Sequence, residues 1–304
     1  MAKVKFTIIT LFEEALRPYL EASMMWKAQD KGIVEFNFVN LRDYGLGPHK
    51  SVDDTPYGGG DGMVLRVEPI FAAVEKIKET CQKNGEIEPK VILPTPDGEL
   101  WNENLARQFA KIDLPDSDVD AIETSIRGKT AEGKPLNLSN ASKNSSLFSR
   151  ADASLSVNKG QGNNPLIHYV IICPHYEGYD ERILKLVDYK ICLGPYVLTG
   201  GELPALVIID SIVRLLKGVL GGATSADIES FSNEDINNIE APQYTKPSDF
   251  RGMKVPDVLL SGDHKKVATW RKEHEKKTTL MPHPCLDIKS IDKNTYEWYN
   301  EMIV

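Results

Sequence analysis

The chain has 304 residues, of which 41% are hydrophobic and 26% charged, as in ordinary soluble proteins with a sizeable core and two domains. Its net charge of −8 excludes a uniformly basic surface, although a local basic cluster that contacts nucleic acid is still compatible with that sum. No apolar run is long enough to span a bilayer and no leader pattern is present, so we expect a cytoplasmic protein without membrane contact.

Short apolar runs recur along the chain, and most are separated by segments of helical length. They cover Val4–Thr10 and residues 34–39, 91–93, 169–173 and 190–193. Such runs are typical of parallel strands that are buried on both faces. Residues 68–81 carry apolar side chains at spacings of three and four, with Pro69 in the first turn, which predicts a helix on one face of the sheet. The pattern predicts an α/β fold with a mostly parallel sheet.

A second helix is expected over residues 203–216, where nearly every side chain is apolar. Its polar residues Asp210 and Arg214 lie four positions apart on one narrow stripe, so most of the helix must be buried, against the sheet or another subunit. From the pattern alone we favour a surface ion pair between these two residues, worth only about 0.3–0.5 kcal/mol.

Two polar stretches divide the chain. Residues 116–164 are rich in Ser, Asn, Asp, Lys and Gly and are interpreted as a flexible insertion, and residues 223–240 as an interdomain linker. The part that follows, 241–304, contains a predicted helix over 263–277 with Lys265, Lys272 and Lys276 on one face. This basic face suits phosphate contacts, but a solvated helix face explains the same residues and is favoured without further support.

The four cysteines form no CxxC pair and no cluster with histidine at metal-ligand spacing, so we expect reduced, buried thiols and no metal site. They are Cys81, Cys173, Cys192 and Cys285. The glycine signatures GxGxxG and GxxxxGK[ST] are also absent. Instead, Gly-rich segments occur at 52–63, 175–182 and 193–205. Gly200 and Gly201 can take positive φ angles and let a ligand approach the backbone closely, and we expect the three segments to form one composite pocket.

Four sequence blocks follow one another along the chain: VDDTPYGGGDGM from residue 52, HYEGYDER from 175, LGPYVLTGGELPA from 193 and VLLSGDHKKVATWR from 258. Together they closely resemble the bacterial tRNA (guanine-N1)-methyltransferases, over the whole chain apart from the insertion. The resemblance implies a SPOUT-class fold, with a C-terminal trefoil knot in a catalytic domain at 1–222 and a small helical tRNA-binding domain at 241–304. It also implies methyl transfer from S-adenosylmethionine to N1 of the guanosine at tRNA position 37, by a homodimer whose active site lies between subunits.

The same resemblance assigns site residues. Those expected to bind the cofactor are Tyr176, Glu177, Gly178, Leu193, Gly194, Tyr196, Val197, Leu198, Gly200, Gly201 and Pro204. Those expected to bind tRNA are Asp53, Gly58, Gly59, Gly60, Lys265 and Lys272. The family usually requires magnesium, for which Glu177 or Asp180 is a candidate, although no spacing assigns it.

The reaction needs a base, because N1 of guanine carries a proton, and a cation near O6, where negative charge develops. By the resemblance Arg214 supplies that cation, which replaces the ion-pair interpretation. The family's base is an aspartate before a Ser-Phe pair, whereas this chain has Glu229 before Ser230-Phe231, and Asp227 two residues upstream is an alternative.

The chain also departs from the family pattern at Pro174, Pro195 and Asp61. The two prolines either weaken cofactor binding or stiffen the loops. Two other functions are therefore kept open: a noncatalytic RNA-binding relative, and a knotted methyltransferase that acts on another RNA.

Overall fold

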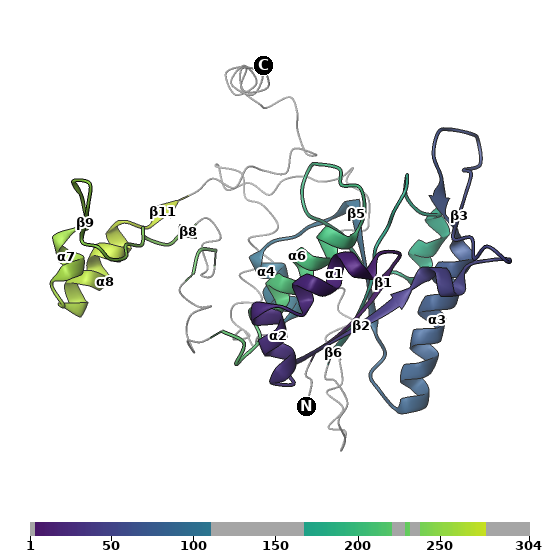
Figure 1. The fold of residues 1–304 in the computed structure, drawn as a ribbon, viewed down its shortest axis with the longest axis horizontal. Coiled ribbons are helices and arrows are strands. Elements are labelled where there is room, and N and C mark those ends of the chain that lie inside the picture. Colours follow the sequence, from purple (N-terminus) through teal and green to yellow (C-terminus); the bar gives the residue numbers. More distant parts are fainter. Residues whose placement is uncertain (1–3, 111–166, 221–228, 232–237, 278–304) are drawn as a thin grey trace, which may run out of the picture.

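The computed structural model describes residues 4–110, 167–220, 229–231 and 238–277 (Figure 1). Its centre is a five-stranded sheet in the order β2-β1-β6-β5-β7, in which every strand pair is parallel. The strands are β1 (Val4–Thr10), β2 (Val34–Asn40), β5 (Lys90–Leu100), β6 (Ile167–Ile172) and β7 (Tyr189–Cys192). The predicted α/β class and parallel sheet are confirmed, and each predicted strand overlaps an observed one.

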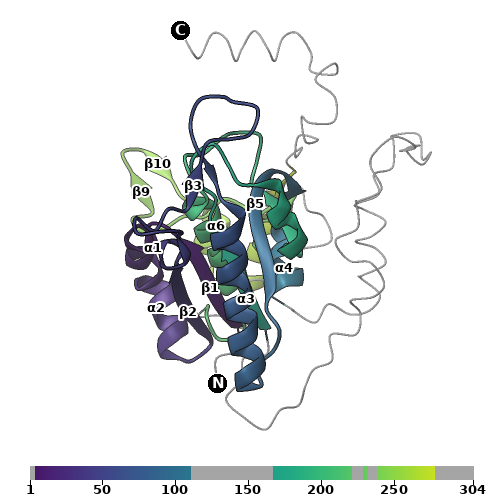
Figure 2. The same cartoon turned by 90° about the vertical axis from the view of Figure 1, so that its right-hand side faces the viewer.

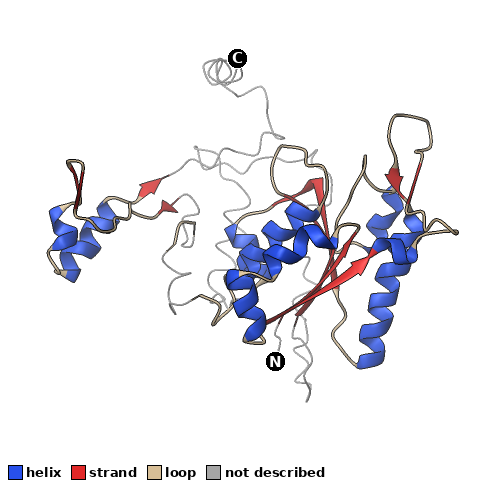
Figure 3. Cartoon of the chain, viewed as in Figure 1, coloured by secondary structure: helices blue, strands red, loops and turns tan. Residues whose placement is uncertain are grey.

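Helices cover both faces of this sheet, which gives three layers (Figures 2 and 3). One face packs against α1 (Glu13–Leu20), α2 (Ser23–Asp30), α4 (Glu103–Phe109) and α6 (Glu202–Val213), and the other against α3 (Val67–Asn84) with the 3-10 helices η1 (Leu41–Tyr44) and η3 (Glu181–Leu186). In β1, Phe6 and Ile8 enter the first core and Ile9 the second. This two-sided burial explains why the inner strands β1 and β6 are mostly apolar.

The helix predicted at 68–81 is confirmed within α3, and the one predicted at 203–216 is observed as α6. The single chain buries only part of the apolar surface of α6, so burial of the rest against another subunit stays a prediction. Leu203 is 60% exposed and Val207 48% exposed, whereas Ile208, Ile209 and Ile212 lie in the core.

The C-terminal elements form a separate small unit, drawn in yellow-green in Figure 1. They are β8 (Asn238–Ile239), β9 (Asp249–Phe250), β10 (Met253–Lys254), α7 (Asp257–Leu260), α8 (His264–Glu273) and β11 (Lys276–Lys277). The Asp263 side chain accepts hydrogen bonds from the backbone N–H groups of Lys265 and Lys266, which caps the first turn of α8. The predicted extension of this helix to residue 277 is wrong, because Lys276 and Lys277 pair with β8 instead.

Within the described ranges, no helix is long and apolar enough to cross a membrane. The predicted insertion at 116–164, Asp227 and Cys285 lie outside those ranges. The other three cysteines are free and buried, as expected.

Candidate functional site

A cavity of about 180 Å³ opens at the carboxyl ends of β6 and β7, beside the irregular middle of β5. Ligand sites of open parallel sheets lie at this carboxyl edge. All residues predicted to bind the cofactor line this one cavity: Tyr176, Glu177, Gly178, Leu193, Gly194, Tyr196, Val197, Leu198, Gly200, Gly201 and Pro204. Two Gly-rich segments that are separate in the sequence are therefore adjacent walls of one pocket.

The wall formed by residues 200–201 requires glycine for a reason other than the expected one. Neither residue has a positive φ; Gly201 has φ −83°. Instead, a Cβ on Gly201 would lie 2.4 Å from Pro174 Cδ and 2.7 Å from Cys173 Cα. The Gly201 N–H donates a hydrogen bond of 2.7 Å to the Pro174 carbonyl, so the loop crosses directly over the end of β6. Gly200 and Gly201 therefore do not adopt the positive φ angles that glycine allows, and close contact within the protein explains why both are glycine.

The opposite wall is the turn that follows β6. Tyr176 has φ 62° and Gly178 φ 136°, the region where a side chain is unfavourable, so this turn is strained at Tyr176. The Glu177 N–H donates to the Met63 carbonyl at 3.0 Å, and the Leu65 N–H to the Gly178 carbonyl at 2.9 Å. The first Gly-rich block is thereby attached to the cavity.

A third wall, from β5, was missed by the sequence reasoning. It is formed by Pro94, Thr95 and Pro96, where the register of β5 with β7 shifts between Pro94 and Glu99. Thr95 Oγ1 lies 2.9 Å from the Tyr179 hydroxyl oxygen. The Pro-Thr-Pro-Asp-Gly cluster is a turn signal that could have identified this wall.

A buried polar group lies beside the cavity. His175 Nδ1 lacks a hydrogen-bond partner within the described chain and is 4.0 Å from Glu202 Oε2. Glu202 also accepts a 2.8 Å hydrogen bond from the Thr10 hydroxyl. His175 and Thr10 were not predicted as site residues.

The two predicted catalytic residues lie together at a second cavity of about 530 Å³. Arg214, which directly follows α6, forms an ion pair with Glu229 rather than the pair with Asp210 that the helical pattern favoured. Both side chains are about one-third exposed, at 32% and 29%. Glu103 of α4 lines the same cavity, and burial raises the pKa of its carboxyl group while the neighbouring Arg107 opposes the shift. A cation and a carboxylate therefore face one cavity.

These two cavities lie at opposite ends of α6. Gly201 and Pro204 contact the first, and Arg214 contacts the second. At a rise of 1.5 Å per residue, the helix separates Gly201 from Arg214 by roughly 20 Å. One chain therefore does not bring the predicted cofactor residues and the predicted catalytic residues together.

The residues predicted to bind tRNA occupy two places. Asp53 lies in β3 (Asp53–Asp54), which pairs with β4 (Val64–Leu65), and Gly58, Gly59 and Gly60 form the connecting turn with φ of 89°, 79° and 129°. Lys265 and Lys272 lie on α8 of the C-terminal unit, and no residue of this helix is buried.

Comparisons with protein families, with curated proteins and with solved structures all find tRNA (guanine-1)-methyltransferases. The sequence matches the family described as tRNA (Guanine-1)-methyltransferase TrmD over residues 4–114 and 155–287. A tRNA (guanine-N(1)-)-methyltransferase of Halalkalibacterium halodurans is 40% identical over 284 residues, which are 93% of this chain and 91% of the relative. One from Dictyoglomus turgidum is 38% identical, over 93% and 89%. The crystal structure of tRNA (m1G37) methyltransferase from Aquifex aeolicus aligns with TM-score 0.58 and 30% identity, over 90% of this chain and 89% of that one.

Proposed function

Because this chain belongs to the tRNA (guanine-1)-methyltransferase family, we propose that it transfers a methyl group from S-adenosylmethionine to N1 of the guanosine at position 37 of tRNA. The observation that supports this most strongly is the convergence of three Gly-rich or Pro-rich loops on one cavity at the carboxyl edge of the sheet. S-adenosylmethionine supplies an electrophilic methyl group when it is bound. The apolar, backbone-rich walls of this cavity suit its adenosine and methionine parts.

The pairing of Arg214 with Glu229 suits the acceptor. On guanine the O6 oxygen and the N1 proton are on neighbouring ring atoms, so one cation and one carboxylate held side by side can address both. We propose that Glu229 removes the N1 proton and that Arg214 stabilises the charge that develops on O6. In the free chain the two groups neutralise each other. The incoming base then replaces that ion pair with its own polar edge.

The separation along α6 supports an active site that is shared between two copies. A methyl group and the atom that accepts it must approach to roughly 3 Å, whereas the cofactor cavity and Arg214 of one chain are far apart. We propose that the chain forms a homodimer in which Arg214 and Glu229 of one copy serve the cofactor cavity of the other. The exposed apolar residues of α6, Leu203 and Val207, are the proposed dimer contact.

The remaining assignments follow from this arrangement. The Gly58–Gly60 turn, which precedes the Met63 carbonyl that accepts a hydrogen bond from the cavity wall at Glu177, and the basic residues Lys265 and Lys272 are proposed to bind tRNA. The knot predicted for residues 1–222 remains a prediction. For magnesium we favour Glu177, which faces the cavity, over Asp180, whose carboxylate accepts hydrogen bonds of 2.8 and 2.6 Å from Arg182. A tRNA substrate suits the predicted cytoplasmic location.

Two experiments test these proposals. Labelled S-adenosylmethionine is incubated with the protein and two tRNA transcripts that differ only at position 37, and only the transcript with guanosine is expected to be labelled. Equal labelling would refute the assigned position. If tRNA binds but S-adenosylmethionine does not, the chain is a noncatalytic RNA-binding relative.

The shared site is tested by subunit mixing. A Glu229→Gln chain keeps its cofactor cavity, and a Gly201→Ala chain keeps its base, so a mixed dimer contains one complete shared site. At an S-adenosylmethionine concentration below the wild-type dissociation constant, each variant alone is expected to lose at least tenfold in rate, and mixed dimers obtained by co-expression of the two chains are expected to recover methyl transfer. A failure to restore activity in proven mixed dimers would place the whole site in one chain.

A further inference from the structure

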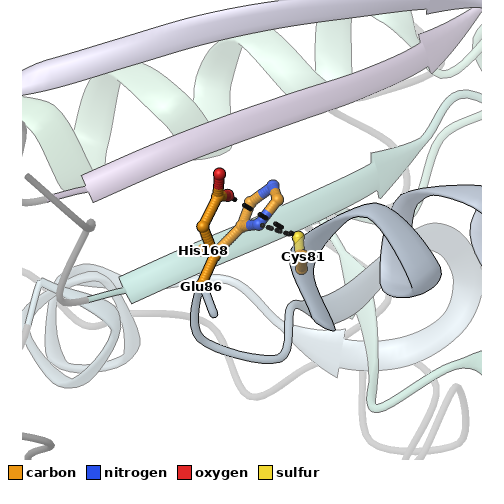
Figure 4. Close-up of side chains that lie close together, drawn as sticks. All are labelled: Cys81, Glu86 and His168. Atoms are coloured by element: carbon orange, nitrogen blue, oxygen red, sulfur yellow. Dashed lines mark hydrogen bonds between the residues drawn. The ribbon is translucent and has the colours of Figure 1, made fainter. Parts of the chain in front are cut away.

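Three side chains with metal-binding atoms converge far from the cofactor cavity, between α3 and the central sheet (Figure 4). Cys81 lies in the last turn of α3, Glu86 follows that helix, and His168 is the second residue of β6. His168 therefore lies at the amino end of β6, whereas the cofactor cavity opens at its carboxyl end. Cys81 and His168 are 3% and 2% exposed, and the Glu86 side chain is 15% exposed.

The local fold brings the first two residues together. Gly85 ends α3 with φ 65°, a left-handed conformation that reverses the chain without a Cβ clash. The Glu86 N–H then donates a 2.8 Å hydrogen bond to the Cys81 carbonyl, so Glu86 folds back over the helix end. His168 joins them from the face of β6 that also directs Val170 into the core beneath α3.

The distances are close to those of a tetrahedral metal site. Cys81 Sγ is 3.4 Å from His168 Nδ1 and 3.8 Å from the Glu86 carboxylate, and the three ligand atoms lie within 4.8 Å of one another. Zinc bonds of about 2.0–2.3 Å in tetrahedral geometry place ligand atoms roughly 3.3–3.8 Å apart. Two of the three separations therefore need almost no change.

Neighbouring groups orient the ligands. Thr7 Oγ1 lies 2.9 Å from His168 Nε2, so the histidine can donate its Nε2 proton to this hydroxyl and keep Nδ1 free of a proton. Burial lowers the pKa of His168 to about 4, with a smaller contribution from Lys5, which favours the neutral ring that a metal requires. Asn84 Nδ2 donates a 3.1 Å hydrogen bond to Glu86 Oε1.

One cation already occupies part of this arrangement. Lys5 Nζ donates to Glu86 Oε2 at 3.1 Å, but the same ammonium is also 3.7 Å from Glu35. Lys5 and His168 are directly paired in the register of β1 and β6, and Lys5 and Glu35 in that of β1 and β2. The lysine can therefore turn towards Glu35 when another cation binds Glu86.

We propose that Cys81, Glu86 and His168 bind a zinc ion, with water as the fourth ligand. A sulfur, an imidazole nitrogen and one carboxylate favour zinc and related transition ions over magnesium, which prefers oxygen ligands. The ion ties the end of α3 to β6. Since it does not reach the cofactor cavity, its role is to stabilise the fold rather than to take part in methyl transfer.

Cobalt(II) is the probe, because its bond to a thiolate gives a charge-transfer absorption in the near ultraviolet. The reduced full-length chain is treated with chelator, freed of the chelator and titrated with cobalt and then with zinc. We expect one cobalt per chain, the thiolate band, loss of the band when zinc displaces cobalt, and a higher melting temperature with zinc.

Variants decide which residues are responsible. Cys81→Ser is expected to abolish the band, and Glu86→Gln and His168→Gln to weaken binding at least tenfold. The matched controls are Cys192→Ala and Glu88→Gln, whose glutamate side chain is 78% exposed and bonded to Lys78 instead. Both controls are expected to bind cobalt as the wild type does.

Lys5→Ala gives the sharpest result, because it removes the competing cation and is expected to tighten binding. If this cluster were only a hydrogen-bond network, that change would remove a contact and add no affinity for metal. The proposal is overturned if the wild type shows no thiolate band with excess cobalt, or if the band survives in Cys81→Ser. Should Cys81→Ser fail to fold, an unchanged affinity in Glu86→Gln, whose side chain lies nearer the surface, overturns it equally.

Discussion

The proposed base gives the sharpest test of the reaction, because its removal should affect rate and stability very differently. Glu229→Gln removes the negative charge while it keeps the size of the side chain. Its ion pair with Arg214 is about one-third exposed, so its loss should cost at most about 1 kcal/mol of folding free energy. In domains of roughly 150–250 residues that loss lowers the melting temperature by about 2–4 °C, and in this longer chain by no more than that.

The expected effect on methyl transfer is much larger. Removal of a general base typically costs about 10²–10⁴-fold in rate, which is about 2.7–5.4 kcal/mol on the barrier. Single-turnover rates with saturating S-adenosylmethionine and a guanosine-37 transcript measure this step directly. Glu229→Asp keeps the carboxylate one methylene shorter, and we expect it to recover most of the lost rate. Asp227→Asn is the matched control and should be nearly normal.

The order of these rates decides the assignment. A crippled Asp227→Asn beside a nearly normal Glu229→Gln would move the base by two residues. If both variants are nearly normal in an active enzyme, the base lies elsewhere, and Glu103 in the same cavity would be the next residue to change.

Three further outcomes are expected. Gly201→Ala should weaken S-adenosylmethionine binding at least tenfold by calorimetry, since its Cβ has no room against the end of β6; an unchanged affinity would contradict the observed loop crossing. In metal-free protein His168 stays neutral until about pH 4, whereas the unfolded chain takes up its proton near pH 6.5. Stability should therefore fall by up to about 3 kcal/mol as the pH is lowered through this window, and a His168→Gln variant with the same pH dependence in denaturant titrations would refute this cause. Lys265→Glu and Lys272→Glu should each weaken tRNA binding and reduce the slope of log K against log salt concentration by about 1. Lys76→Glu on α3 should change neither the affinity nor the slope.

The strands could be predicted because their signal is local. The inner strands β1 and β6 direct apolar residues into both cores, so a short run identifies them without knowledge of their neighbours, and β1 matches its predicted bounds fully. The C-terminal end of α8 could not be predicted in this way. Lys276 and Lys277 continue a helical pattern, but their backbone pairs with Asn238 and Ile239, which are distant in the sequence. A long-range pairing of this kind leaves no trace in the local spacing.

The site shows the same limit. The blocks that carry the family resemblance identified the cavity walls that lie within them, but the wall from β5 has only a turn signal. The Cys81, Glu86 and His168 cluster was not predicted, because two of its members are five positions apart and the third is 87 positions from Cys81. Only the packing of α3 on β6 brings them together, whereas metal motifs are recognised by short spacings.

Pro174 and Pro195, which depart from the family pattern, do not remove either of the backbone hydrogen bonds observed around them in the cavity walls. The Pro174 carbonyl accepts the hydrogen bond from Gly201, and a proline keeps its carbonyl. Around Pro195, the Tyr196 N–H donates to the Gly194 carbonyl at 2.9 Å, so that bond passes over the proline and does not need its missing N–H. A proline whose ring fits the native backbone conformation reduces the conformational entropy of the unfolded chain, which stabilises the folded protein by about 0.4–1 kcal/mol. The prolines should therefore stiffen both cavity walls, which lowers the entropy lost when the cofactor binds rather than weakening its binding.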